Sequence, residues 1–217
     1  MTAPQIESDW DRKRAAILTA AGEVFAERGF KGGTTKEIAE RSGLSQPSIY
    51  HYVGSKNDLL LEIVREVDAY GSRIFDRLKE AGDSPVEKLR LIIHAQLELA
   101  LESPALYEVY WHEQRSLPAA LAGELTKGRS GYIRRVDRIT RECQAAGALP
   151  ANHSSRVLTE GILGMLHVAT RWYRPGGKYE PSEIADAFCD LVGLAPAAAA
   201  AKIKAPPARK RAASRAA

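Results

Sequence analysis

The chain has 217 residues, of which 45 % are hydrophobic, which is enough for a DNA-reading module plus a larger helical domain. The net charge of +4 is uneven: residues 202–217 hold six basic side chains and no acidic one, which leaves −2 on residues 1–201. No apolar run approaches the roughly 20 residues that a membrane span needs, and the N-terminus does not read as a signal peptide. Composition therefore argues against a membrane protein, and we expect a soluble, cytoplasmic one associated with the nucleoid.

Helical periodicity dominates the sequence, and no convincing alternating strand pattern appears, so the expected fold class is all-α. Residues 1–11 are expected to form a flexible arm. A first helix is predicted over 14–28, ended by Gly29. Further helices are predicted at about 34–43, 45–52, from 55 onward, 85–102, 104–115, 119–146, 153–173 and 181–194. The Ala/Pro/Lys/Arg stretch 196–217 has little to bury, and we expect it to be disordered.

The most informative segment covers residues 33–60 and reads GTTKEIAERSGLSQPSIYHYVGSKNDLL. Thr34 and Glu37 have the spacing of a capping box, which marks the start of a helix. Gly43 permits the left-handed turn that stops this helix, and Ser45 caps the next helix only two residues later. Two short helices joined this tightly, with Gly in the joint, are typical of a helix-turn-helix.

The second helix of such a motif enters the major groove with its N-terminal residues at the base edges. We expect Gln46, Pro47 and Ser48 there, because Gln reads adenine through paired contacts and Pro or Ser meets a thymine methyl or an acceptor. The other candidate DNA contacts offer polar groups to phosphates and are Thr34, Thr35, Ser45, Tyr50, His51, Tyr52 and Lys56. An ordinary helical bundle would need Thr34 and Ser45 as caps as well.

This segment resembles the DNA-binding domain of the TetR repressor family, through the paired Thr, the IA, the SGLS turn, the IY pair and the SK and LL that follow. The resemblance implies a three-helix helix-turn-helix DNA-binding domain over 12–60 and a helical ligand-binding and dimerisation domain over 61–195. The arm 1–11 precedes them and the basic tail 196–217 follows. It also implies a homodimeric repressor that binds palindromic double-stranded operator DNA and is released by a small-molecule effector.

Two helices near the C-terminus carry apolar stripes suited to a dimer interface. Over 155–173 the stripe comprises Leu158, Ile162, Met165, Leu166 and Ala169, with Gly161 and Gly164 allowing close helix approach. Over 181–194 it comprises Ile184, Phe188, Leu191 and Val192. Two such helices from each subunit would form an intermolecular four-helix bundle.

Polar and aromatic side chains inside apolar helix patterns are the candidates for a ligand pocket. They are His94, Tyr107, Tyr110, Trp111, Gln114, Arg115, Tyr132, His167, Arg171 and Trp172. Each of them has a structural alternative, because such side chains also fill helical cores with one polar end satisfied.

The fragments EQRSLP (113–118) and RWYRPGG (171–177) resemble the TetR branch whose effectors are acyl-CoA thioesters, including regulators of fatty-acid and sterol degradation. The resemblance implies a small lipophilic ligand of this kind. Its phosphates would need cations. Arginines crowd one long helix at positions 134, 135, 138 and 141, although a solvated face accounts for them equally well.

Neither an enzyme nor a metal or cofactor site is expected. His112 and Glu113 begin like a zinc-binding helix, but the second His four residues on is missing. Cys143 and Cys189 make no metal-like cluster and are expected to be buried free thiols. Two alternatives stay open: a nucleoid-associated, weakly sequence-specific DNA-binding protein led by its basic tail, and a TetR-type regulator of a different lipophilic ligand.

Overall fold

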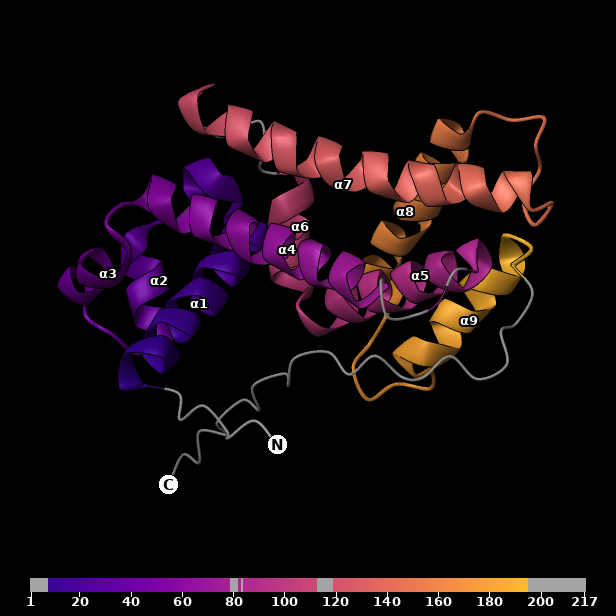
Figure 1. The fold of residues 1–217 in the computed structure, drawn as a ribbon. Coiled ribbons are helices and arrows are strands. Elements are labelled where there is room, and N and C mark those ends of the chain that lie inside the picture. Colours follow the sequence, from indigo (N-terminus) through magenta and orange to yellow (C-terminus); the bar gives the residue numbers. More distant parts are fainter. Residues whose placement is uncertain (1–7, 79–81, 83, 113–118, 195–217) are drawn as a thin grey trace. The chain divides into compact units, whose positions relative to one another are not determined.

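The computed structural model describes residues 8–78, 82, 84–112 and 119–194. Over these residues it consists of helices without strands (Figure 1). The helices are α1 (Asp9–Gly32), α2 (Thr35–Ser42), α3 (Gln46–Val53), α4 (Lys56–Leu78), α5 (Pro85–Glu102), α6 (Pro104–His112), α7 (Ala119–Ala145), α8 (Ser155–Trp172) and α9 (Pro181–Leu191). The all-α prediction is confirmed. No described helix is long and apolar enough to cross a membrane.

The start of α1 corrects one expectation. Residues 9–11, predicted to belong to the arm, are helical, and Ser8 is the N-cap. Ser8 Oγ accepts a hydrogen bond from the Asp11 backbone N–H (3.1 Å), and the Asp11 carboxylate accepts one from the Ser8 backbone N–H (3.2 Å). This reciprocal pair extends α1 toward the N-terminus. At the other end Gly29 has a non-helical backbone (φ 68°), as its predicted stop position implies, and helical structure resumes as far as Gly32.

The chain forms two compact units. One contains the described residues up to Arg73 and those of 103–132, and the other contains the described residues of 74–102 and those from Ile133 onward. α6 belongs to the first unit because it returns to pack against α1. A Cβ on Gly22 would lie 2.6 Å from Leu106 Cδ2, so this glycine allows α6 to approach closely. The predicted functional boundary near residue 60 stays a prediction.

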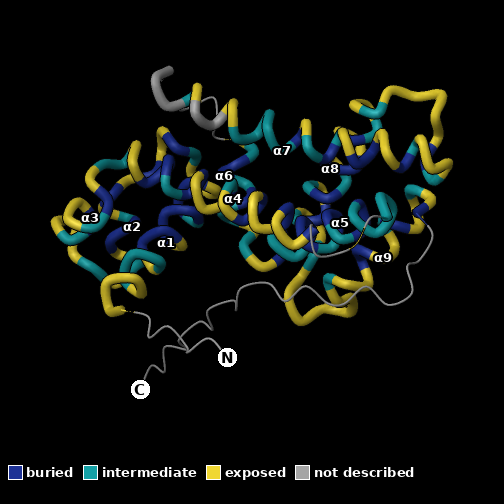
Figure 2. The backbone as a smooth tube through the Cα atoms, in the orientation of Figure 1, coloured by how far each residue is buried: buried dark blue, intermediate teal, exposed yellow. Residues whose placement is uncertain are grey.

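The hydrophobic core of the first unit is shared by all of its helices that precede α7. Its fully buried side chains come from α1, α2, α3, α4 and α6 and include Ile17, Phe25, Ile38, Ile49, Leu59, Ile63 and Tyr107. Exposed and half-buried residues predominate along α3, in contrast to this core (Figure 2). The short helix α3 is therefore held by few anchors and presents most of its side chains outward.

In the second unit α5 packs against both α8 and α9. The buried thiols Cys143 and Cys189 are free, as predicted, and burial raises the pKa of each to about 11. Such thiols stay protonated at neutral pH and are poor nucleophiles.

Candidate nucleic-acid interface

The turn between α2 and α3 is built as the sequence predicts. Thr34 Oγ1 accepts from the Glu37 backbone N–H (3.2 Å), and Glu37 Oε2 accepts from the Thr34 backbone N–H (3.1 Å). Gly43 ends α2 in the left-handed conformation (φ 70°). Ser45 then caps α3 by accepting from the Ser48 backbone N–H (3.3 Å). These local bonds produce a helix-turn-helix, in which α3 occupies the position of the recognition helix.

α3 is anchored by two buried side chains, Ile49 and Val53. Its other residues face outward or are half-buried. Gln46 and Pro47 are exposed and Ser48 is half-buried, at the start of the helix where base contacts are expected. Tyr50 is 48 % exposed, which leaves part of its ring accessible to a partner.

Thr35 connects the two helices beneath this surface. Its hydroxyl accepts a hydrogen bond from Gln46 Nε2 (2.9 Å) and lies 3.1 Å from the Tyr50 hydroxyl. Thr35 itself is only 8 % exposed. The structure therefore gives Thr35 a role that sequence reasoning missed: it orients Gln46 and Tyr50 from below. Its predicted phosphate contact stays a prediction.

Lys56 begins α4 and lies against the end of α1. Its Nζ is 4.6 Å from the Phe30 ring centroid and 3.4 Å from the Lys31 carbonyl oxygen, to which it donates. A cation–π contact and a carbonyl acceptor hold the ammonium group in place without neutralising it. Its predicted phosphate contact stays a prediction.

The remaining predicted contacts are also placed. Thr34 and Ser45 serve as the caps described above, which is the structural role that a helical bundle would require of them. His51 is exposed and Tyr52 is half-buried at the C-terminal half of α3. Ion pairs surround the motif, with Arg41 donating to Glu27 (2.8 Å). The direct DNA contacts of all ten candidates remain predictions.

In the first unit, the aromatic ligand candidates gather around a polar pair. Tyr107 is fully buried, and the Trp111 ring lies 6.0 Å from it and 5.9 Å from the Tyr110 ring. The Tyr110 hydroxyl donates to Asp68 Oδ1 (2.8 Å). Burial raises the pKa of Tyr110 and also that of Asp68, where the Tyr110 hydrogen bond partly offsets it. Asp68 is a candidate that sequence reasoning missed, because only the return of α6 reveals its partner.

The other ligand candidates are dispersed. Tyr132, also in the first unit, lies against α4, where a Cβ on Gly71 would be 3.0 Å from its ring. His94 lies in the second unit, and its Nε2 is 3.0 Å from Asp186 Oδ1, which also accepts from Arg90 Nη2 (2.9 Å). The second unit also holds His167, which is half-buried, and Arg171 and Trp172, which are exposed. Gln114 and Arg115 lie outside the described residues.

The apolar stripe predicted for a dimer on α8 faces largely inward, whereas that on α9 is only partly buried. On α8, Ile162, Leu166 and Ala169 are buried within the protomer, and on α9 so is Ile184. The most exposed apolar side chains on these helices are Val157, Val168 and Trp172 of α8, which lie outside the predicted stripe, and Leu191 of α9, which belongs to it. Gly161 and Gly164 lie on the exposed side, with nothing within 4 Å of an added Cβ. On α8 the apolar residues available to a partner are therefore not those of the predicted stripe, whereas on α9 the predicted Leu191 is available.

Asp68 provides a test of the polar pair. Desolvation raises the pKa of Asp68, so the native state binds the carboxyl proton more tightly than the unfolded state does. The stability that protonated Asp68 contributes is therefore fully present below the unfolded pKa and is lost as the pH rises through the folded pKa. Asp68→Asn keeps an acceptor for Tyr110 and removes the charge. We expect it to raise the thermal midpoint at pH 7, with the advantage vanishing below about pH 4.

The control is Glu66→Gln, an exposed change on the same helix whose effect should be small at either pH. Thermal unfolding followed by circular dichroism between pH 3.5 and 8 is the measurement. A lower midpoint for Asp68→Asn at pH 7 would mean that the charge is stabilised where it lies, against this interpretation.

α2 and α3 are joined by a tight turn, and α3 is mostly exposed and held by two buried side chains. A larger set of helices follows them in the chain. This is the arrangement of a helix-turn-helix DNA-binding regulator. Residues 17–63 match the family model described as bacterial regulatory proteins of the tetR family, and residues 82–194 match the tetracyclin repressor-like C-terminal domain. The chain belongs to the TetR family, and the resemblance stated from the sequence is confirmed.

Relatives of known role extend over most of the chain. The HTH-type transcriptional repressor KstR2 of Mycolicibacterium smegmatis is 26 % identical over 192 residues, which cover 88 % of this chain and 93 % of that protein. The fatty acid metabolism regulator protein of Bacillus subtilis is 26 % identical over 182 residues, which cover 83 % and 93 %.

Solved structures share the fold. The ketosteroid transcriptional regulator KstR2 of Mycobacterium tuberculosis superposes with a TM-score of 0.76 at 22 % identity, covering 88 % of this chain and 96 % of that one. AibR in complex with isovaleryl coenzyme A and operator DNA gives 0.72 at 22 %, covering 84 % and 98 %. FadR from Bacillus subtilis in complex with stearoyl-CoA gives 0.62 at 25 %, covering 82 % and 97 %.

Proposed function

We propose that this protein is a TetR-type transcriptional repressor that leaves its palindromic operator when it binds an acyl-CoA thioester. The observation that carries the DNA-binding part is the arrangement of α2 and α3, where the buried Thr35 hydroxyl holds Gln46 and Tyr50 on the exposed face of the recognition helix. The protein is a regulator rather than an enzyme, it needs no cofactor, and it acts on the chromosome in the cytoplasm.

The exposed apolar side chains of α8 and α9 support a homodimer. Val157, Val168 and Trp172 are 66 %, 47 % and 46 % exposed, and Leu191 is 74 % exposed. Side chains of this size gain from burial against a second copy. In the dimer, two recognition helices about 34–36 Å apart would meet successive major grooves on one side of the DNA.

The effector assignment rests on the relatives and on the character of the candidate residues. One neighbour is in complex with isovaleryl coenzyme A and another with stearoyl-CoA. The aromatic cluster of Tyr107, Tyr110 and Trp111, whose two tyrosines are buried, would supply apolar surface for an acyl chain once the helices around it part, with Asp68 and Tyr110 as polar groups. Native mass spectrometry of protein purified from its own host tests this assignment. A bound mass equal to a CoA thioester supports it, and a bound lipid without the nucleotide contradicts it.

Selection of bound sequences from a random DNA library tests the repressor assignment. We expect one palindromic sequence with half-sites separated by about one helical turn, or 10–10.5 base pairs. Binding to all sequences alike with a steep salt slope would instead favour the nucleoid-associated alternative. Deletion of 202–217, which lies outside the described residues, separates the contribution of the basic tail.

Gln46 and Lys56 form a matched pair of predictions for the interface. Gln46→Ala should relax base preference at one position of each half-site, costing about 1–3 kcal/mol there. Lys56→Ala should weaken binding to all sequences alike and lower the salt slope by about one. Binding measured by fluorescence anisotropy on the operator and its single-base variants distinguishes the two effects. Unchanged selectivity for Gln46→Ala would place another residue at that base.

A further inference from the structure

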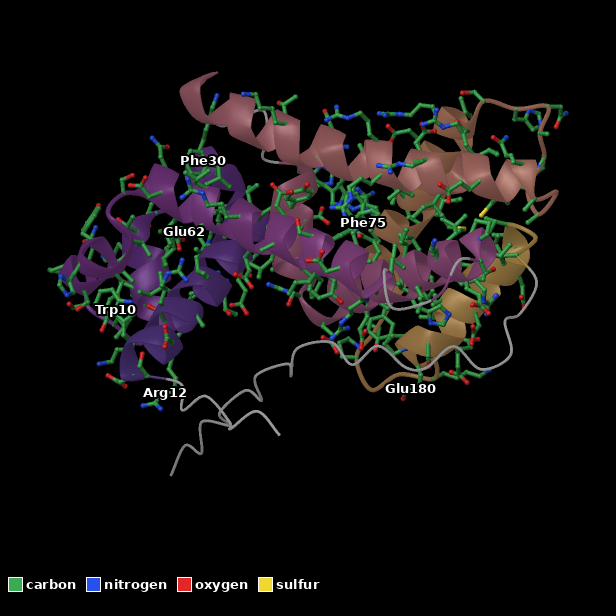
Figure 3. The ribbon with its side chains drawn as sticks, viewed as in Figure 1. Trp10, Arg12, Phe30, Glu62, Phe75 and Glu180 are labelled. Carbon is green, nitrogen blue, oxygen red and sulfur yellow. The ribbon has the colours of Figure 1, made fainter. Side chains whose placement is uncertain are left out.

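Trp10 lies on the first turn of α1 beside the C-terminal half of the recognition helix (Figure 3). Its ring centroid is 4.2 Å from that of Tyr52, with the planes tilted by 42°. It is also 5.5 Å from the His51 ring, in an edge-on arrangement at 82°. Tyr52 and His51 themselves meet edge-on at 5.6 Å. Three aromatic rings thus join the start of α1 to the end of α3.

The turn that carries Trp10 is well held. The Ser8–Asp11 capping box fixes its start. The Asp9 carboxylate pairs with Lys13 (2.7 Å) and Arg12 (3.2 Å), which lower the pKa of Asp9. Lys13 also interacts with Tyr52, and its pKa is raised, chiefly by Asp9. Acidic and basic side chains balance in this turn, so it has little net charge with which to attract phosphates. A role of Trp10 in DNA binding would therefore depend on the residues that its ring contacts.

The recognition helix needs such support. α3 has eight residues, of which only Ile49 and Val53 are buried. Trp10 is 43 % exposed, so it contributes less to the core than a buried tryptophan would, while one side of its ring covers Tyr52. We propose that Trp10 is a positioning residue for DNA recognition, which fixes the orientation of Tyr52, and with it His51, toward the operator. This inference rests on the proposed function, in which α3 reads DNA.

A double-mutant cycle between Trp10 and Tyr52 tests the proposal. An aromatic pair contributes about 0.5–1.5 kcal/mol beyond its buried area, which corresponds to an affinity change of roughly two- to twelvefold. Trp10→Ala should weaken binding to the selected operator within that range, and Trp10→Phe should retain most of the affinity. In the Tyr52→Ala background, Trp10→Ala should change the affinity by less than about twofold, because the residue through which it acts is gone.

A second readout uses the unaltered residue. With Trp111→Phe and Trp172→Phe in place, Trp10 is the one remaining tryptophan of the chain's three. Once this variant is shown to bind operator as the unaltered protein does, the emission of Trp10 should shift or be quenched when operator saturates the protein. This readout also applies if Trp10→Ala unfolds the protein, as judged by its thermal midpoint.

The outcomes separate the two hypotheses. If the unaltered protein binds no operator, the proposed function fails. If it binds, three results would each overturn the role of Trp10: unchanged affinity for Trp10→Ala, an equal loss in the Tyr52→Ala background, or emission that operator leaves unaltered.

Discussion

Ile49→Ala is expected to lower the free energy of unfolding by about 2–5 kcal/mol, because it truncates a fully buried side chain and leaves a cavity that the neighbouring side chains fill only in part. Ile49 is one of two buried anchors of α3, so its loss should also detach the recognition helix and abolish specific operator binding. Denaturation by guanidinium at fixed dimer concentration, with operator affinity measured on the same samples, gives both quantities.

Ile49→Val is the matched control, since it removes one methylene and should cost about 0.5–1.5 kcal/mol with binding retained. If Ile49→Ala left both the denaturation midpoint and operator affinity unchanged, α3 would not be docked through this side chain, and the helix-turn-helix would need another anchor.

Tyr107→Ala should be at least as damaging, at about 3–5 kcal/mol by analogy with other buried aromatic side chains. Tyr107 is fully buried on α6, next to Leu106, which fits against Gly22 of α1. Removing the ring therefore leaves a cavity close to the contact between α6 and the DNA-binding helices. The midpoint of guanidinium denaturation measures the loss.

Tyr107→Phe separates volume from polarity. It keeps the ring and removes only the hydroxyl, which is worth about 0.5–1.5 kcal/mol when hydrogen-bonded. A loss as large as that of the alanine variant would show that the hydroxyl, and not the packing of the ring, is what the site requires.

The helix-turn-helix could be predicted because its determinants are local. The Thr34–Glu37 capping box, the left-handed Gly43 and the Ser45 cap each act within four residues, and all three appear in the structure. The same local signal was present at Ser8 and Asp11, and it places residues 9–11 in α1 rather than in an arm. Capping therefore determines these boundaries more directly than apolar periodicity does.

What the sequence could not predict depends on contacts between distant residues. Tyr110 and Asp68 are 42 positions apart, and His94 and Asp186 are 92 apart, so neither partner could be identified from spacing. α8 shows a further limit. Its periodicity reveals apolar residues, but not that Ile162 and Leu166 would be used inside the protomer while Val168 and Trp172 stay exposed. A helix with apolar residues on two sides leaves that choice to its tertiary neighbours.

Effector-dependent release from the operator is the most direct test of the whole account. Fluorescence anisotropy of a labelled operator duplex, saturated with protein, is followed during titration with acyl-CoA thioesters of several chain lengths, with the matching free fatty acids and with CoA alone. An effector that prefers a conformation unable to bind DNA must release the operator in proportion to that preference. The account predicts release by a thioester at concentrations at which neither the free acid nor CoA has an effect. An operator that stays bound in the presence of every thioester would contradict it.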